Sequence, residues 1–418
     1  MKHAMHLELV ACLLLTTTPT AASQAIALTP AEAVGLSAER LQRIDDKLTE
    51  YVDQGLIAGG VVAVARRGKV VRFDAVGMAD IEKHRPMQTD AIFRIASMTK
   101  PIVTVAAMTL YEDGRLGLDD PVSKYVPEFK RLKVYSPITT DGVPAKRGVT
   151  IRDLLSHTSG LTYGLFGETP VDSAYRAANL TAGTLRDLVR KLSDLPLLHQ
   201  PGERWEYSWS TDVLAYVIET VSHQPLDEFL SKRVLLPLGM RSTGFYVPPD
   251  QLGRLAAMYN LSSSAHLEPV ADPRASRPAF LSGGGGLVST AADYLRFSQM
   301  LLNKGSLDGV HLLNASTVDL MTSNHIPAAA LPLHSSLKEL DDYMQGYGFG
   351  FGVRVLLDRD GVGTGSKGAF GWSGARNTFV WIDPTEELIG IMMIQLAPFR
   401  RLPIDREVER LLYQSIVR

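Results

Sequence analysis

Strand-forming sequence is concentrated towards the two ends of this 418-residue chain, and this placement limits the folds that it can adopt. In the N-terminal part, residues 60–65 and 69–76 are two β-rich runs with the spacing of a hairpin. In the C-terminal part, residues 346–356, 377–382 and 388–396 are three further strand candidates. The simplest arrangement places both ends of the chain in one antiparallel sheet covered by helices.

Two amphipathic helices are predicted beside these strands, one at each end of the chain. Ser37 is a suitable cap for the first, and residues 405–417 form the second. The middle of the chain contains short helical segments punctuated by proline and glycine. We therefore expect an α+β fold, in which residues 26–120 and 285–418 form an α/β domain and residues 121–284 an all-α insertion. An active site is expected between the two units, where pockets tend to form.

Composition and charge exclude several classes of protein. The chain is 45% hydrophobic and 21% charged, as in ordinary globular proteins, and its net charge of −2 gives no reason to expect nucleic acid or an anionic membrane as partner. Residues 1–25 resemble a secretory signal peptide, which predicts a periplasmic or secreted protein. Their apolar run is too short to span a bilayer, so no stable membrane anchor is expected. The single cysteine, Cys12, excludes an intrachain disulfide.

A Ser-x-x-Lys motif, Ser97 to Lys100, stands at the start of an apolar helical run that ends before Gly114. Residues three apart share one face of a helix, so Lys100 is expected to point towards the Ser97 hydroxyl. A free serine must lose its proton to attack, and a lysine can take that proton or stabilise another base. A second Ser-x-x-Lys, Ser335 to Lys338, lies in a polar stretch and indicates only the start of a surface helix.

Tyr207, in the segment Pro201–Ser208, is a candidate partner for this motif. Most buried tyrosines only pack and form a hydrogen bond. Beside a lysine ammonium, however, the pKa of the phenol falls. The resulting tyrosinate could accept the Ser97 proton and pass it to the leaving alkoxide.

The segment Gly371–Asn377 is the third part of the candidate active site, after the Ser-x-x-Lys motif and Tyr207. It leads into a predicted strand. A glycine at a strand edge lets substrate approach the backbone closely. Backbone N–H groups in this segment and at Ser97 could hold a developing oxyanion.

Other patterns carry less weight. The glycines at 283–286 lack the spacing of a nucleotide-binding loop, and those at 361–365 indicate a hairpin turn. Residues 371–375 fall one residue short of a nucleophile elbow and precede a β-pattern instead of a helix. His157 would suit a Ser-His-Asp hydrolase, but it lies in a stretch that we interpret as structural. The histidines form no His-Glu-x-x-His pattern, so no metal or other cofactor is implied.

Together these motifs resemble the serine β-lactamase and penicillin-binding-protein-like superfamily, and most closely the family VIII carboxylesterases related to class C β-lactamases. The resemblance extends from about Leu36 to the C-terminus and includes further stretches at Asp120–Tyr125, Val149–Leu161, Pro237–Met240 and Gly285–Ala291. It implies an α/β unit built from both chain ends with an all-α insertion. By the same resemblance Ser97 is the acylated nucleophile, Lys100 its proton-relay partner and Tyr207 the general base. The amides of Ser97 and Ala375 then form the oxyanion hole.

Two departures from the lactamase pattern bear on the substrate. Trp372-Ser373-Gly374 stands where the lactamases have Lys-Thr-Gly, whose lysine helps to bind the substrate carboxylate. Trp209 stands where they have an asparagine that contacts the lactam side-chain amide. We therefore expect a carboxylesterase acting on small neutral esters. A β-lactamase, a D-amino acid peptidase or an acyltransferase could use the same machinery, and a catalytically silent binding or sensor domain could retain the same fold.

Overall fold

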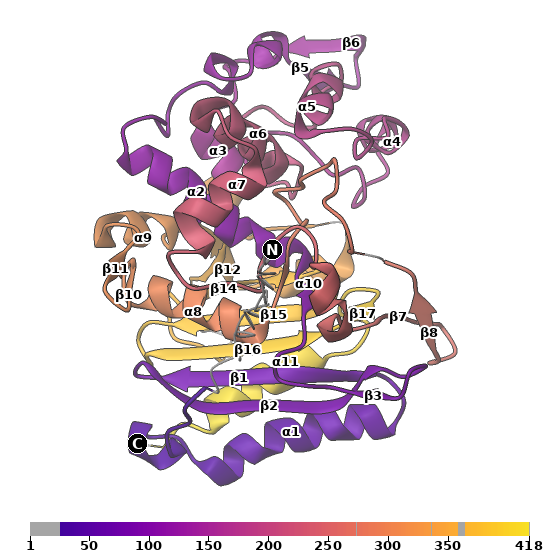
Figure 1. Cartoon of the computed structure of the whole chain (residues 1–418). Coiled ribbons are helices and arrows are strands. Elements are labelled where there is room, and N and C mark those ends of the chain that lie inside the picture. Colours follow the sequence, from indigo (N-terminus) through magenta and orange to yellow (C-terminus); the bar gives the residue numbers. More distant parts are fainter. Residues whose placement is uncertain (1–25, 273, 336, 358–363, 418) are drawn as a thin grey trace, which may run out of the picture.

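The computed structural model describes residues 26–272, 274–335, 337–357 and 364–417. Their largest element is an eight-stranded antiparallel sheet, in the order β12-β13-β14-β15-β16-β1-β2-β3 (Figure 1). The strands are β1 (Gly59–Arg66), β2 (Lys69–Asp80), β3 (Arg85–Pro86), β12 (Tyr347–Phe349), β13 (Arg354–Leu356), β14 (Phe370–Gly374), β15 (Thr378–Asp383) and β16 (Leu388–Ile394). The expected sheet from both chain ends is therefore confirmed.

The junction between the two chain ends is the pairing of β1 with β16, in which Gly60 lies opposite Ile394 and Arg66 opposite Leu388. All eight residues of β1 are buried. Its side chains alternate between two cores, with Val61 in the core on one face and Val62 in the core on the other. This period of two is what a strand buried on both faces requires.

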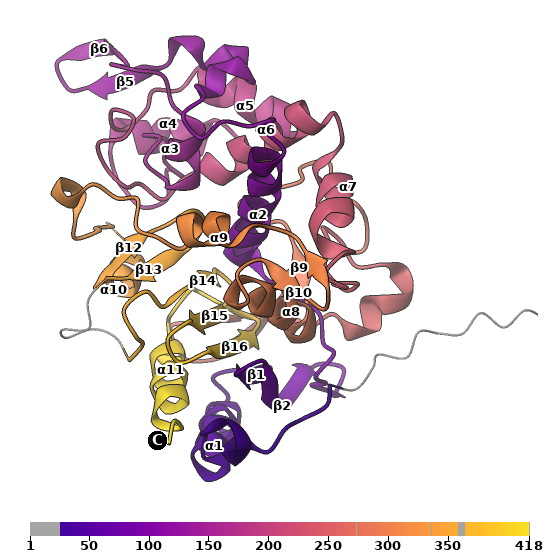
Figure 2. The ribbon, with the colours of Figure 1, turned by 90° about the vertical axis from the view of Figure 1, so that its left-hand side faces the viewer.

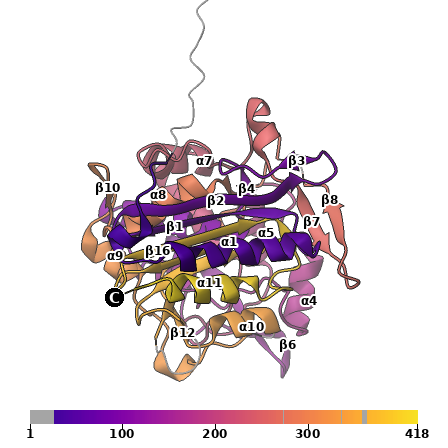
Figure 3. The same cartoon turned by 90° about the horizontal axis from the view of Figure 1, so that it is seen from below.

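Helices pack on both faces of the sheet, and others form a separate unit. The helices of the described residues are α1 (Ala38–Asp53), α2 (Thr99–Glu112), α3 (Ile151–Leu155), α4 (Pro170–Ala177), α5 (Leu185–Ser193), α6 (Ser210–Ser222), α7 (Leu226–Leu230), α8 (Ala291–Leu302), α9 (Ala315–Met321), α10 (Lys338–Met344) and α11 (Ile404–Gln414). The terminal helices α1 and α11 lie side by side on one face (Figure 3), and α8 packs on the other. As predicted, the Ser37 side chain caps α1 by accepting from the Arg40 N–H.

Helices α2 to α7 form a second layer above the sheet, and α2 runs upward into it from the sheet (Figure 2). Helix α6 contacts α2, α3, α5 and α7, so it is the central element of this helical unit. Thr150, Thr169 and Thr184 begin three of the helices with complete capping boxes, in which the threonine and an aspartate three residues later bond each other's backbone N–H.

The structure also contains short strands that the sequence did not reveal. They are β4 (Phe93–Arg94), β5 (Lys133–Ser136), β6 (Thr139–Pro144), β7 (Met258–Leu261), β8 (Leu267–Val270), β9 (Val288–Ser289), β10 (Ser306–Leu307), β11 (Val310–His311) and β17 (Leu396–Ala397). The helical middle of the chain therefore carries two hairpins, β5–β6 and β7–β8, in addition to its helices.

One strand prediction is wrong in its extent, because residues 346–356 form two strands, β12 and β13, instead of one. Gly352 in the turn between them has φ +73°, and a Cβ there would lie 2.3 Å from the Thr104 hydroxyl of α2. This turn therefore requires a glycine at position 352. The predicted signal peptide lies outside the described residues, as does most of the glycine turn at 361–365. None of the helices in the described ranges is long and apolar enough to cross a membrane.

Candidate active site

Ser97 lies in a short 3-10 turn, Ala96–Met98, between β4 and α2, and not in the α-helix itself. Ala96 before it has φ +43°, a left-handed conformation that costs energy for a residue with a Cβ. The turn is held on one side by the hydrogen bond from the Ile95 N–H to the Leu287 carbonyl. On the other side it packs against the end of β14, where a Cβ at Gly374 would lie 2.2 Å from the Ile95 oxygen. Strained backbone held by its surroundings is typical of functional sites.

Lys100 occupies the first turn of α2 and is completely buried. Its ammonium donates to the Tyr163 hydroxyl at 3.0 Å and to the Gly284 carbonyl at 2.7 Å, and it lies 4.5 Å from the centre of the Tyr207 ring. The polar partners of the ammonium are therefore Tyr163 and Gly284, whereas the sequence predicted an approach to the Ser97 hydroxyl. Burial lowers the pKa of Lys100 to about 7, and the negative charge of Asp212 opposes this shift. Lys100 can therefore change charge near neutral pH.

Tyr207 lies between this lysine and Trp372, and its side chain is buried. The indole N–H of Trp372 donates to the phenol oxygen at 3.3 Å. Burial raises the pKa of Tyr207, while hydrogen bonding with Ser97 and Trp372 opposes the rise. The pKa therefore rises where the sequence predicted a fall, because the cost of removing the phenol from water outweighs these hydrogen bonds. Tyr207 is in place to exchange a proton with Ser97, but it is protonated in the resting site.

Asp212 is a buried carboxyl behind Lys100 that the sequence motifs did not single out. Its Oδ1 accepts from the Ser282 hydroxyl at 2.6 Å and from the Gly284 N–H at 3.0 Å, and its Oδ2 has no protein hydrogen-bond partner among the described residues. Gly284 thus links the two charges, since its N–H donates to Asp212 and its carbonyl accepts from Lys100. A Cβ at Gly284 would lie 2.3 Å from Asp212 Oδ2 and 2.8 Å from the Tyr163 hydroxyl. Only a glycine fits there.

A signal for these missed residues existed in the sequence. Asp212 lies in the first turn of α6, directly before its run of buried apolar residues, and a buried acid is usually paired or functional. Tyr163 follows the Val149–Leu161 stretch by two residues, but nothing local to it indicates that its hydroxyl meets a lysine from α2. Burial raises the pKa of Tyr163, so it is a neutral partner for Lys100.

Trp372, Ser373 and Gly374 are buried residues of β14, and Ala375 directly after them is exposed. Trp372 is 1% exposed, and its ring packs against Tyr207, Tyr343 and Phe349. The strand expected after this segment is present as β15, and residues 370–374 form a further strand that was not predicted. Trp372 therefore contributes a wall and one N–H donor to the site, and no charge.

Trp209 lies at the start of α6 and is half-buried. Its ring contacts Tyr163, with ring centres 5.0 Å apart, and Phe280, with ring centres 6.3 Å apart. Phe166 stacks on Tyr207 from the same loop as Tyr163. The side of the site opposite Trp372 is thus aromatic as well.

The residues with weaker signals lie in structural positions. His157 is buried behind Tyr207, where its Nδ1 contacts the Ser208 hydroxyl at 3.2 Å, and burial holds its pKa well below the usual value. Ser335 accepts a hydrogen bond from the Leu337 N–H just before α10, and Lys338 pairs with Asp342 in the first turns of that helix. Within the described ranges, no group of three or more histidine, cysteine and acidic side chains could hold a metal ion.

Comparisons with known proteins agree with this architecture. The β-lactamase family matches residues 44–414. An uncharacterized protein of Mycobacterium tuberculosis is 40% identical over 362 residues, which cover 84% of this chain and 89% of that protein. Esterase EstB of Burkholderia gladioli is 36% identical over 281 residues, 61% of this chain and 68% of EstB. The solved structure of EstCE1, a hydrolase with promiscuous acyltransferase activity, has a TM-score of 0.78 at 30% identity and covers 92% of this chain and 99% of its own.

The family match spans nearly the whole sheet and the helical unit, and two of these relatives are esterases or hydrolases by name. The protein is accordingly a serine hydrolase of the esterase type. It belongs to the β-lactamase family, among the family VIII esterases related to class C β-lactamases.

Proposed function

We propose that this protein is a carboxylesterase that hydrolyses short-chain neutral esters through an acyl-enzyme on Ser97. The observation that carries the proposal is the buried Lys100, whose pKa is about 7 and whose ammonium lies 4.5 Å from the ring centre of Tyr207. The Ser97 hydroxyl is in turn close enough to Tyr207 to lower the pKa of its phenol. A base that ionises near the working pH gives the best compromise between proton affinity and availability.

In this mechanism the Ser97 hydroxyl attacks the ester carbonyl while its proton moves to the Tyr207 oxygen, and Tyr207 passes its own proton to neutral Lys100. Neutral Lys100 with a neutral Tyr207 carries the same number of protons as an ammonium with a tyrosinate, so the two forms titrate together. Their shared apparent pKa is set by the lysine. Tyr207 then gives a proton to the leaving alkoxide and regains one from the Lys100 ammonium. Water repeats the sequence to release the acid and restore Ser97.

The backbone amides of Ser97 and Ala375 are proposed to hold the oxyanion. The close approach of Gly374 to Ile95 supports this role, because it places the residue after β14 beside the turn that carries Ser97. Donors fixed in this way stabilise charge in the transition state without reorganisation.

The choice of a neutral ester rests on Trp372 and Trp209. A β-lactam or a peptide C-terminus brings a carboxylate into this cleft, and an anion without a cationic partner is costly to desolvate. The buried Trp372 supplies an apolar wall and uses its N–H on Tyr207. Trp209 has no amide for a lactam side chain and meets Tyr163 and Phe280 instead. A short neutral acyl group needs neither contact.

The test compares p-nitrophenyl esters of graded chain length with a chromogenic cephalosporin. We expect kcat/KM for the butyrate ester to exceed that for any penicillin or cephalosporin by roughly 10³, which corresponds to about 4 kcal/mol of transition-state binding. Trp372→Lys should raise kcat/KM for the cephalosporin and lower it for the ester. Trp372→Phe, which keeps the apolar wall, should preserve the ratio between the two substrates. Equal efficiency on both substrate classes would refute the proposal. Loss of the cephalosporin reaction in Arg376→Gln would then identify the neighbouring arginine as the substitute cation.

Acyl transfer is the second candidate, and the similarity to EstCE1, which is described as a hydrolase with acyltransferase activity, favours it over lactam or peptide hydrolysis. Both ester hydrolysis and acyl transfer pass through the same acyl-enzyme, and they differ in whether water or an alcohol accepts the acyl group. Adding a small alcohol to the ester assay and measuring the new ester against the free acid separates them. A transfer product that exceeds the acid at modest alcohol concentration would make the protein an acyltransferase.

A further inference from the structure

The β5–β6 hairpin projects from the helical unit at the end of the molecule farthest from the sheet (Figures 1 and 2). Ile138, between its strands, is 90% exposed, and the other exposed large apolar residues in the described ranges are 36% to 67% exposed. Val143 on β6 adds a second exposed apolar side chain. A hairpin tip that presents an isoleucine to water gains nothing from it within this chain.

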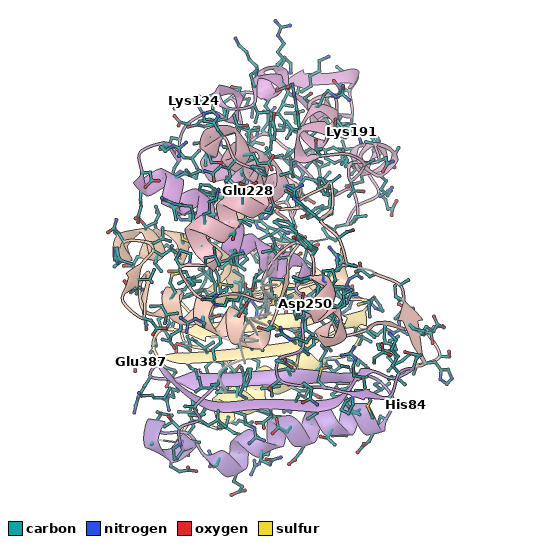
Figure 4. The ribbon with its side chains drawn as sticks, viewed as in Figure 1. His84, Lys124, Lys191, Glu228, Asp250 and Glu387 are labelled. Atoms are coloured by element: carbon teal, nitrogen blue, oxygen red, sulfur yellow. The ribbon has the colours of Figure 1, made fainter. Side chains whose placement is uncertain are left out.

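The segment that contains this hairpin is strongly basic. Residues 124–149 contain six lysines and arginines and two acidic residues, although the whole chain has a net charge of −2. The remaining residues therefore carry −6. Figure 4 shows Lys124, at one end of this segment, on the helical unit, whereas His84 and Glu387 lie at the sheet. The net charge on which the sequence-based expectation rested thus conceals one basic region.

A hollow of about 420 Å³ opens at the base of the hairpin. Its apolar surface comes from residues such as Phe129, Leu132 and Val149, and its basic residues are Lys130, Arg131, Lys133 and Arg147. Arg147 is paired with Asp153. Lys130, Arg131 and Lys133 have no ion-pair partner among the side chains that the structure describes. The hollow therefore combines apolar lining with available positive charge.

We infer that the β5–β6 hairpin is a docking surface for an anionic lipid bilayer, with Ile138 entering the interfacial region and Lys130, Arg131 and Lys133 meeting lipid phosphates. The combination of a projecting apolar tip and an adjacent basic rim fits a membrane, which offers negative charge at its surface and apolar chains a few ångströms deeper. An acidic protein could form ion pairs with the lysines and the arginine, but it would also need a pocket that fits Ile138. This contact is reversible and peripheral, and it does not depend on the ester chemistry at Ser97.

The test is sedimentation of the full chain with vesicles of phosphatidylcholine alone or mixed equally with phosphatidylglycerol. We expect binding to the mixed vesicles, little to the neutral ones, and release at high salt, because salt screens exposed charges. Equal partition onto both kinds of vesicle, or onto neither, would overturn the inference.

Four variants separate insertion from simple charge attraction. Lys130→Gln combined with Lys133→Gln should weaken partition about 30-fold, as expected for two cations at an anionic surface. Ile138→Asp should weaken it at least about tenfold, the lower range for losing one buried aliphatic side chain. Leu236→Asp and Lys69→Gln change exposed residues elsewhere and should leave binding unchanged. Hydrolysis of a soluble ester should be the same in all four, which also confirms that they fold.

Two results would contradict the inference. If Ile138→Asp binds the mixed vesicles as well as the native chain, the hairpin tip does not enter the bilayer. If Leu236→Asp and Lys69→Gln lose as much binding as the hairpin variants, the adsorption is not specific to this surface. If the chain binds an acidic polypeptide and does not bind the vesicles, the partner is a protein and the proposed membrane docking is wrong.

Discussion

Asp212→Asn is the change that most directly tests the proposed proton relay. When kcat/KM is plotted against pH, its rise on the acid side (the acid limb) should report the deprotonation of Lys100, whose pKa is about 7 in the native site. Asp212 raises this pKa by favouring the ammonium. Asparagine keeps an acceptor for Ser282 and the Gly284 N–H and removes the charge. The variant should therefore retain activity at lower pH than the native enzyme.

The size of the shift follows from the path between the two groups. The Gly284 N–H lies 3.0 Å from Asp212 Oδ1, and its carbonyl oxygen lies 2.7 Å from Lys100 Nζ. For unit charges about 7 Å apart at an effective dielectric constant of about 20, Coulomb's law gives about 2.4 kcal/mol. Since one pH unit corresponds to about 1.4 kcal/mol, the acid limb should move down by between about one and two pH units.

The assay is hydrolysis of p-nitrophenyl butyrate from acidic to mildly alkaline pH, with each variant scaled to its own plateau. Asp293→Asn is the matched control, because Asp293 is also buried and hydrogen-bonded, to Ser242 and Thr243, but does not influence Lys100. Its limb should coincide with the native one. An unchanged or raised limb in Asp212→Asn would refute the reasoning, because Asp212 would then be uncharged when the enzyme works.

Ser97→Ala should lower turnover by several orders of magnitude because the covalent route is lost. Ser335→Ala should have nearly the turnover of the native protein. If the two variants have similar turnover, Ser97 is not the nucleophile. Tyr207→Phe should fold normally and lose at least about 10²-fold in turnover, and near-native rates would leave the base role to Lys100 alone. Burial, together with the charge of Asp172, raises the pKa of Glu206 from 4.5 to about 7, so the native protein becomes less stable as the pH rises through that range. In urea unfolding, Glu206→Gln should therefore be more stable than the native protein by about 3 kcal/mol at pH 8 and equally stable at pH 4. Prolonged EDTA treatment should leave activity intact, and zinc-dependent recovery after a loss would contradict the serine mechanism.

Much of the fold could be predicted because its signals are local. Ser37, Thr150 and Thr290 cap helices by hydrogen bonds within three residues, so the residue types themselves mark the boundaries. The alternation along β1 is likewise a property of one strand. By contrast, residues 346–356 divide into two strands at a turn whose Gly352 packs close to Thr104, and that neighbour is distant in the sequence.

The candidate site shows the same division. Its motif residues Ser97, Lys100 and Tyr207 could be named from sequence, but their electrostatics could not. The pKa of Tyr207 rises where a neighbouring cation predicts a fall, because burial depends on the surrounding fold. Tyr163 and Asp212 reach Lys100 from separate segments, so their importance emerges only when the helical unit is assembled.

The pairing of β1 with β16 has a consequence for how the chain is made. Gly60 emerges from the ribosome long before Ile394, its partner in the sheet. Until then β1 presents an eight-residue edge without its final neighbour, and such edges invite association with other chains. A chain cut short before Leu388 would retain Ser97, Lys100 and Tyr207 but lack β16, the interior strand that joins the two halves of the sheet. We therefore expect β1 to be protected from such association only when the last strands have been made.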